Sequence, residues 1–247
     1  MAESDRVRVE PCAKRVRAVL GDEVVADSSA ALLVWEVPYY PTYYFPSSDV
    51  RTELLTPTTG SGRSPSTGEA SQYTVKAGDA EGAAYRVQDP NLPELQDRYV
   101  LVWNTMDHWY EEDDEVFVHA RDPHTRVDIL SSSRRVRIEV DGVTIADSHN
   151  GRFLFETGLP ARYYLPKDDV RMDLLTPTEK VTACPYKGKA RYWSVTTNGV
   201  TYPDLVWGYE DPLPESERIA GMVCFFNEKA DIYLDEVLQE RPKNKFG

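Results

Sequence analysis

One ten-residue stretch, CPYKGKARYW (184–193), combines a thiol, two lysines, an arginine and three aromatic side chains. A turn in this stretch can hold Cys184 close to Lys187, and a nearby ammonium group favours the thiolate form of a cysteine. Nucleophilic catalysis by Cys184 would also need a base, and the one histidine between residues 134 and 238 is His149. A cysteine-dependent enzyme is therefore one hypothesis, and a buried, inert cysteine is its structural alternative.

Ligand binding is a second chemistry, and the residue types suit it better. Arginine binds carboxylates and phosphates through paired hydrogen bonds, and aromatic rings can form the walls of a pocket. Glu156 ends an apolar strand, where burial would raise its pKa toward that of a general base, although a solvated strand end or an ion pair is the simpler interpretation. The candidate catalytic residues are Glu156, Cys184 and Lys187, and the candidate ligand-binding residues are Arg162, Tyr163, Tyr186, Arg191, Tyr192, Trp193 and Trp207.

The cations of this candidate site are expected to be exposed. Replacement of Arg162 or Lys187 by alanine would then change the stability by no more than about 0.5 kcal/mol. The alternative for the aromatic residues is that Trp193 and Trp207 belong to the core, with solvated cations beside them.

Metal and cofactor motifs are missing from the sequence. No pair of Cys or His residues has the close spacing of a zinc site, and GSGRSPSTGE (60–69) lacks the Gly-Lys-Ser/Thr ending of a phosphate-binding loop. We therefore predict no metal site and no cofactor.

Charge and composition limit the partners. Acidic residues outnumber basic ones 41 to 28, for a net charge of −13, so the sequence argues against extended nucleic-acid or anionic-membrane binding. Three cysteines, the absence of an apolar leader and an apolar run of only six residues (30–35) favour a cytoplasmic protein. The expected partner is a small molecule, and the oligomeric state stays open.

The chain carries an internal repeat. Residues 15–58 align with residues 135–178 at a constant offset of 120, with 18 identities in 44 positions and no gap. The same offset aligns SPSTGEASQYTV (64–75) with CPYKGKARYWSV (184–195). An LVW triplet at 101–103 matches LVW at 205–207 at an offset of 104, which suggests a longer loop in the first copy. Such a repeat predicts two similar domains.

Both copies have β-strand patterns. Apolar residues alternate around Asp141-Gly142 and Asn198-Gly199, which are favoured hairpin turns. MVCFF (222–226) and ADIYL (230–234) are predicted to form a terminal hairpin. We expect an all-β protein of two tandem antiparallel domains related by an approximate two-fold axis. The expected domains are 1–130, with long loops at 58–71 and 76–98, and 134–238, followed by a tail at 239–247.

Differences between the copies indicate where function lies. Residues that both copies share are simplest to explain as the frame of the fold, whereas the cysteine, the cations and the larger aromatic residues of 184–193 occur in the second copy alone. The second copy is therefore the better candidate for a functional site.

The second copy also resembles a known family. Its order of motifs, RVRIEV, ADS, ETGLPARYYLP, DVRMDLL, CPYKGKARYW and WGYEDPLP, is similar to that of the bacterial domain of unknown function 427 family, which carries a provisional nucleotidyltransferase-like label. The resemblance covers roughly 134–236, and in the first copy it runs through residue 58 and returns around 101–103. It implies a small folded-sheet domain of the β-tent type and no established catalytic residues. The sequence shows no paired-aspartate signature for nucleotidyl transfer.

Together these observations predict that the second domain binds a small anionic or aromatic metabolite, with a role for acid–base catalysis. Two alternatives stay open. One is a non-catalytic tandem scaffold or protein-interaction module, and the other is the enzyme that uses Cys184.

Overall fold

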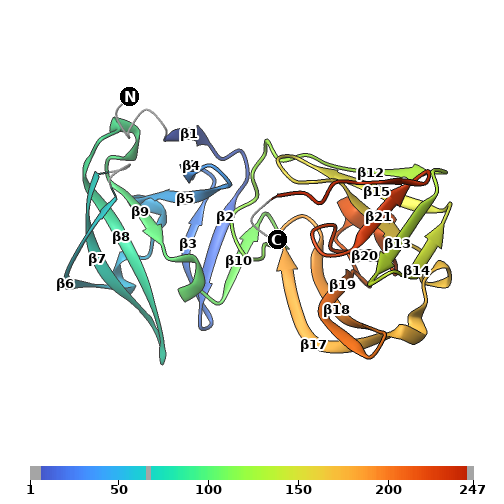
Figure 1. The fold of residues 1–247 in the computed structure, drawn as a ribbon. Helices are drawn as coiled ribbons and strands as arrows, with labels where there is room; N and C mark the ends of the chain where they lie inside the picture. The colour runs from blue at the N-terminus through green and yellow to red at the C-terminus, as the bar shows by residue number, and fades with distance from the viewer. Residues whose placement is uncertain (1–6, 65–67, 244–247) are drawn as a thin grey trace. The chain divides into compact units, whose positions relative to one another are not determined.

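A computed structural model describes residues 7–64 and 68–243, and the side chains of these residues except 61–64 and 89. The chain divides into two units, residues 1–122 and 123–247, each with two antiparallel sheets (Figure 1). The prediction of an all-β chain with two tandem copies is confirmed. In the described ranges no helix has the length and apolar character needed to cross a membrane.

Unit 1 contains a seven-stranded and a four-stranded sheet. In spatial order the first consists of β1 (Arg8–Pro11), β4 (Leu32–Val37), β5 (Tyr40–Pro46), β9 (Arg98–Leu101), β8 (Ala80–Pro90), β7 (Gly68–Ala77) and β6 (Leu55–Ser64). The second consists of β11 (Asp114–Glu115), β10 (His108–Glu111), β2 (Val16–Leu20) and β3 (Glu23–Ser28). Its short 3-10 helices are η2 (Ser47–Asp49), η3 (Thr52–Leu54), η4 (Pro93–Leu95) and η5 (Trp103–Thr105).

Unit 2 repeats this architecture strand for strand. Its seven-stranded sheet has the order β12 (Val127–Ser132), β15 (Gly151–Glu156), β16 (Arg162–Leu165), β20 (Val223–Phe225), β19 (Val200–Gly208), β18 (Gly188–Thr197) and β17 (Leu175–Cys184). Its four-stranded sheet has the order β14 (Val143–Ser148), β13 (Val136–Val140), β21 (Asp231–Leu234) and β22 (Val237–Leu238). Its 3-10 helices are η6 (Lys167–Asp169), η7 (Met172–Leu174) and η8 (Pro214–Ile219).

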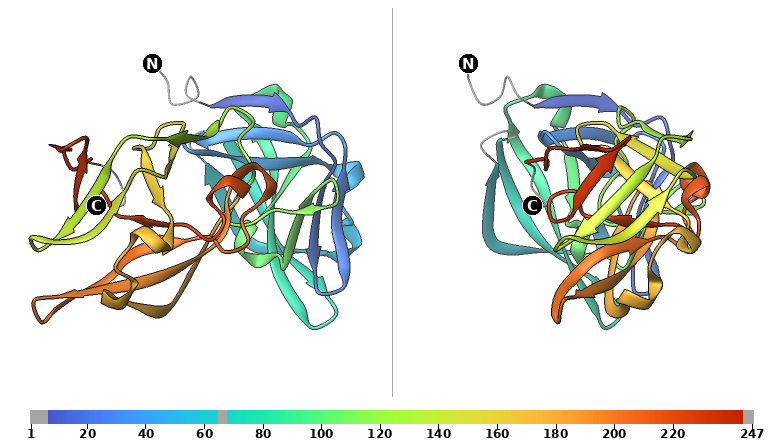
Figure 2. Two further views of the ribbon diagram at one scale, coloured as in Figure 1. Left: turned by 90° about the vertical axis from the view of Figure 1, so that its right-hand side faces the viewer. Right: turned by 45° about the vertical axis from the view of Figure 1, so that its right-hand side comes forward.

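The predicted hairpin turns are present. All four residues of Asp141-Gly142 and Asn198-Gly199 have positive φ, the conformation that two-residue hairpins need. Both views of Figure 2 show the β18–β19 hairpin (orange) extending from unit 2 and the corresponding β7–β8 hairpin (teal) extending from unit 1. The local turn chemistry therefore sets the strand register as expected.

Residues shared by both copies make matching contacts. Ser28 donates a hydrogen bond to Asp49, and Ser148 donates one to Asp169, each at 2.6 Å. In the same way Arg15 binds Asp27, and Arg135 binds Asp147, through two hydrogen bonds each. These contacts link neighbouring segments in each unit, in agreement with the interpretation of the shared residues as the frame.

Two segments predicted as loops in unit 1 are strands. Most of 58–71 lies in β6 and β7, and residues 65–67 of it fall outside the described residues. Most of 76–98 lies in β8, which pairs with β7 and β9 just as β19 pairs with β18 and β20. The offset of 104 is therefore wrong: LVW at 205–207 lies in β19, whereas residues 98–101 form β9, the counterpart of β20. A three-residue identity is too short to fix an alignment.

The predicted terminal hairpin is also wrong. β20 pairs with β16 and β19 in the large sheet, whereas β21 pairs with β13 and β22 in the small sheet. The chain therefore crosses from one sheet to the other between these strands, and β21 joins the first hairpin of its unit.

The end of the predicted first domain belongs to unit 2. Residues 127–132 form β12, which pairs with β15 along its whole length (Figure 1, yellow-green). Ile129 is buried there against aromatic residues of unit 2. The division thus falls between Asp122 and Pro123, earlier than the sequence places it.

Candidate functional site

Strand alternation separates the candidate residues onto two faces of the large sheet of unit 2. The face called here the charged face carries Glu156, Arg162, Tyr164, Tyr192 and Trp207. Register pairs Leu154 with Arg162, so Glu156, two residues further along β15, is a diagonal neighbour of Arg162. This arrangement brings four of the sequence-predicted site residues together.

Tyr163 and Trp193 point to the opposite face. Both belong to the large core between the two sheets, where the Tyr163 ring packs edge-on against Phe153 at 4.8 Å. Arg191 is exposed, and Tyr186 is half-buried in the turn between β17 and β18. The predicted ligand wall is therefore divided, because side chains of consecutive strand residues point to opposite faces.

Arg162 forms a buried ion pair. Its guanidinium donates hydrogen bonds to both carboxylate oxygens of Glu228, at 2.8 and 2.9 Å, and one to Asn227 at 3.2 Å. The Arg162 side chain is 11% exposed and that of Glu228 is 3% exposed. Burial is the largest influence and would lower the pKa of Arg162, but the hydrogen bonds with Glu228 and the negative groups nearby together outweigh it, so the pKa is raised. Arg162 is therefore a permanent cation in an apolar setting.

The second ion pair joins two predicted catalytic residues. Lys187 Nζ donates a hydrogen bond to Glu156 Oε2 at 2.5 Å, and both side chains are 10% exposed. The expectation that Arg162 and Lys187 are exposed is therefore wrong. Removing one partner of a buried ion pair leaves a desolvated charge, which costs much more than a surface substitution.

The turn that carries Lys187 is held in place by backbone contacts. Gly188 has a φ of +92°, and a side chain there would approach the carbonyl oxygen of Asp211 to 3.4 Å. The backbone N–H of Leu213 donates to the carbonyl oxygen of Lys187, and the buried Ser216 hydroxyl donates to that of Tyr186. The segment after β19 thus holds the turn in place beside the charged face.

Aromatic residues surround the two ion pairs. Trp207 Nε1 donates to the Tyr164 hydroxyl oxygen at 3.1 Å, and the Trp207 ring centroid lies 5.4 Å from the Arg162 guanidinium. Burial raises the pKa of Tyr164 and of Tyr209 well above the usual range, and nearby acidic groups, Glu156 among them, raise both further. Both phenols therefore stay neutral and can donate or accept hydrogen bonds.

Cys184, Cys224 and His149 lie in different surroundings in unit 2. Cys184 is half-buried close to Tyr209, whereas His149 Nδ1 contacts the carbonyl oxygen of Ser133 beside Asp147. Cys224 is completely buried, and burial raises the pKa of its thiol to about 12. The contacts of Cys184 and His149 thus place them in different surroundings, so the geometry gives no support to a Cys184–His149 nucleophile.

Unit 1 builds the same sheet with other residues at several of these positions. At the positions that match Arg162, Tyr209 and Cys224 it has Thr42, Val87 and Val100. Glu36 matches Glu156, but it accepts a hydrogen bond at 2.7 Å from the Tyr44 hydroxyl. The fold therefore does not require the ion pairs of unit 2.

Sequence reasoning missed several residues of this face. Glu228 and Asn227 were assigned to a hairpin turn, and Tyr209 and Cys224 were not singled out. The spacing of Trp207 in β19 and Tyr209 directly after it is a signal for an aromatic face. Nothing local in the sequence indicates the pairing of Glu228 with Arg162, which lies 66 positions away.

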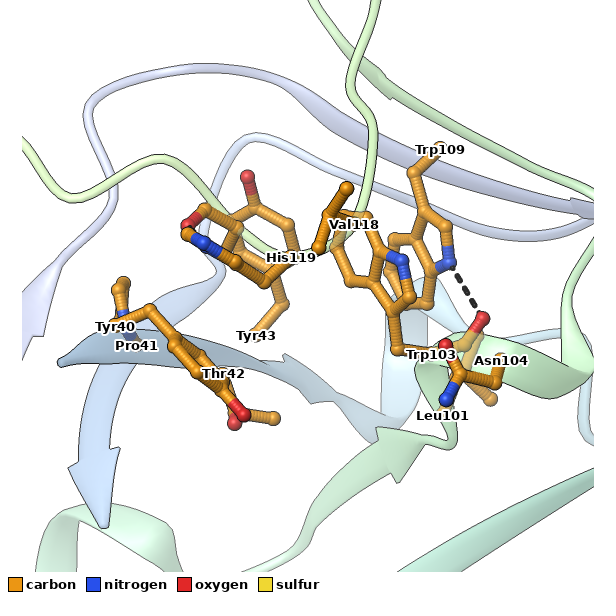
Figure 3. A pocket seen from close by; sticks show the side chains of 11 residues that line it. Tyr40, Pro41, Thr42, Tyr43, Leu101, Trp103, Asn104, Trp109, Val118 and His119 are labelled. Carbon is orange, nitrogen blue, oxygen red and sulfur yellow. Dashed lines mark hydrogen bonds between the residues drawn. The ribbon is translucent and has the colours of Figure 1, made fainter. Parts of the chain in front are cut away.

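A cavity of about 120 Å³ lies in unit 1 (Figure 3). Eleven residues line it: Tyr40, Pro41, Thr42, Tyr43, Leu101, Trp103, Asn104, Trp109, Val118, His119 and Ala120. None of these residues is among the site residues predicted from the sequence. It lies between the start of β5, the end of β9 and the segment that follows β11.

The family model described as domain of unknown function (DUF427), with the label NTP_transf_9, matches residues 8–112 and 128–236. The chain belongs to this family. Its two DUF427 matches coincide with the two structural units, so the first copy matches along nearly its whole length, further than the motifs alone suggested. A comparison with curated proteins gave no match. Among the described residues, no group of three or more His, Cys, Asp or Glu side chains is arranged to hold a metal ion.

Proposed function

We propose that unit 2 binds a small anionic or aromatic metabolite at the charged face, with Glu156 and Lys187 positioned for proton transfer. One observation carries this proposal: unit 2 has two buried ion pairs, Arg162–Glu228 and Glu156–Lys187, whereas the sequence of unit 1 has threonine, Thr42 and Thr67, at the positions of both cations. Buried ion pairs contribute little to stability compared with apolar residues of similar volume. Their presence is better explained by a ligand than by the fold.

The chemistry of the face fits such a ligand. The Arg162 guanidinium offers a planar fork for a carboxylate or phosphate that exchanges with Glu228. Trp207 and Tyr164 supply ring surface next to it, and Tyr209 supplies a neutral phenol. Lys187 and Glu156 form a donor–acceptor pair, and a ligand that replaces one partner can exchange a proton with the other.

The test compares small molecules that co-purify with the native full-length chain. The informative variant is Arg162→Thr combined with Glu228→Asn, which removes both charges together and places at 162 the threonine of unit 1. The matched control is Arg171→Thr with Asp173→Asn, which removes an exposed ion pair of the same unit. We expect mass spectrometry to find a ligand on the wild type and the control and to find it lost from the first variant.

Two results would contradict the proposal. A ligand retained by the Arg162/Glu228 variant would show that the charged face is not its site. A wild-type chain that carries no small molecule, and that gains no thermal stability from a library of carboxylates and phosphates, would favour the alternative of a non-catalytic interaction module.

A further inference from the structure

The cavity of unit 1 is walled mainly by aromatic rings. Trp103 and Trp109 stack with ring centroids 4.5 Å apart and planes at 3°, and Tyr43 lies about 6 Å from both (Figure 3). On the other side Tyr40 stacks on His119 at 4.4 Å. The cavity thus offers several electron-rich ring surfaces within a small volume.

Hydrogen bonds fix these rings. Trp109 Nε1 donates to the carbonyl oxygen of Trp103 at 3.1 Å, so this indole N–H is already used within the wall. The Tyr43 hydroxyl donates to Glu111 at 2.6 Å, and Glu111 is 4% exposed and bound by Lys14. The wall is therefore preorganised, which lowers the entropy lost when a ligand is bound.

Charge decides between ligand classes. None of the eleven lining residues is an Asp, Glu, Lys or Arg, so the wall contains no permanently charged side chain. Unit 1 contains 11 Lys and Arg residues against 22 Asp and Glu residues, a net charge of −11, whereas unit 2 has 17 against 19, a net charge of −2. A strongly acidic domain raises the local concentration of cations and repels anions.

Size limits the group that can enter. The cavity is somewhat smaller than the cavities of ~150 Å³ that bind benzene. A trimethylammonium group is compact enough for this volume, and the faces of Trp and Tyr rings attract such a cation through their quadrupoles. Thr42 and Asn104 add a hydroxyl and an amide that can bind a polar tail.

We propose that this cavity binds the methylated ammonium group of a small organic cation. The site belongs to unit 1 alone. Ile232 occupies the place of Trp109 on the matching strand, and residues 226–230, which match the segment around Trp103, contain no tryptophan. The common fold therefore does not explain the tryptophan stack, and the site is separate from the charged face of unit 2.

The direct test uses a matched pair of probes. Choline carries a trimethylammonium group, and 3,3-dimethyl-1-butanol has the same shape without the charge. Titration of the full-length chain, followed by tryptophan fluorescence and calorimetry, is expected to show saturable choline binding at least about ten-fold tighter than that of the neutral alcohol. Equal affinities, or no saturable choline binding in the millimolar range, would overturn the proposal.

Variants locate the site. Trp103→Leu, a half-buried position, should weaken choline binding about ten-fold, and Tyr40→Ala, at the exposed rim, should weaken it less. Tyr85→Leu, a half-buried tyrosine of β8 outside the cavity, should leave binding unchanged. The Arg162/Glu228 double variant should also bind choline normally, which separates this site from the proposed function. Unchanged choline affinity in both cavity variants would place the binding elsewhere and refute the assignment.

Discussion

The two units share one strand order but differ in what lies on equivalent parts of it. Unit 2 places Arg162 and Lys187 in buried ion pairs on the charged face, whereas unit 1 has Thr42 at the position of Arg162. Unit 1 instead stacks Trp103 on Trp109 beside a cavity. The shared strand order therefore does not determine which functional groups the sheets carry, since the same sheets accept a charged face in one copy and an aromatic cavity in the other.

The largest expected effect comes from breaking the buried pair of unit 2. Arg162→Ala leaves the Glu228 carboxylate buried without its guanidinium, and this should destabilise unit 2 by about 3–5 kcal/mol. Arg162→Thr with Glu228→Asn should recover most of that loss, because unit 1 shows that the sheet accepts a threonine there. Hydrogen exchange of unit 2 peptides in denaturant measures both. A single variant no less stable than the double one would mean that the charged face is not buried in solution.

High pH should weaken unit 2 through Cys224. Burial raises the pKa of this thiol from 9.0 to about 12, so the folded state binds more protons than the unfolded state between these values and stability falls as pH rises. From pH 8 to about 10.5 this thiol should account for a loss of about 2 kcal/mol. Unit 1 has Val100 at this position and lacks this contribution.

Cys224→Ala tests this pH effect. The variant should remove about 2 kcal/mol of the loss in stability that unit 2 shows between pH 8 and about 10.5, whatever its effect on stability at pH 8. Replacement of the half-buried Cys184 by alanine is the control for the loss of a thiol elsewhere in unit 2. An identical slope in the wild type and in Cys224→Ala would show that Cys224 does not carry the effect.

Two matched tyrosines provide a smaller contrast. The Tyr44 hydroxyl donates to the Glu36 carboxylate, whereas the Tyr164 hydroxyl accepts from the neutral indole of Trp207. Hydrogen bonds to charged groups are the stronger ones, so Tyr44→Phe should cost unit 1 about 1.5 kcal/mol and Tyr164→Phe should cost unit 2 about 1 kcal/mol. Hydrogen exchange resolved by unit would reveal the order, and the reverse order would mean that the two hydroxyls do not differ as their partners suggest.

The smallest effects should come from the surface pairs that the units share. Asp27 and Asp147 are held by Arg15 and Arg135, which lower the pKa of each carboxyl group. Each ion pair stabilises the folded state fully at pH values above the pKa that the aspartate has in the unfolded chain. This stabilisation is lost as the pH falls through the lower pKa that the aspartate has in the folded state. Asp27→Asn and Asp147→Asn should each lower Tm at pH 7 by a few degrees at most, and less in high salt. A clear difference between the two variants in differential scanning calorimetry would contradict the equivalence of the frames.

The fold was more predictable than the site. The constant offset of 120 and the Asp141-Gly142 and Asn198-Gly199 turns were enough to predict two similar β domains. β8 was missed because its buried residues include Ala84 and Val87 among polar neighbours, which gives a weak hydrophobic alternation. Pairing between distant strands decides which residues of different segments meet.

The site was predicted only in part for the same reason. Alternation within β16 and β18 could have separated Tyr163 and Trp193 from Arg162 and Tyr192, since neighbouring residues face opposite sides. The partner of Arg162 could not be found in this way. Glu228 lies at the crossing between the two sheets, and its position depends on β20 joining one sheet while β21 joins the other.

The closure of each small sheet affects how the chain is made. In unit 1 Val16 pairs with Glu111, and in unit 2 Val136 pairs with Leu234, so each unit is completed only by one of its last strands. A growing chain can complete unit 1 before most of unit 2 has left the ribosome. β2 is then already paired with β10 when β21 is made, so the two do not pair with each other. In a denatured full-length chain β2 can meet both β10 and β21. The sequence Arg-Val-Arg at 15–17 leads into β2, and the same sequence at 135–137 leads into β13, the native partner of β21. Recovery after complete denaturation should therefore be slower and less efficient than folding during synthesis.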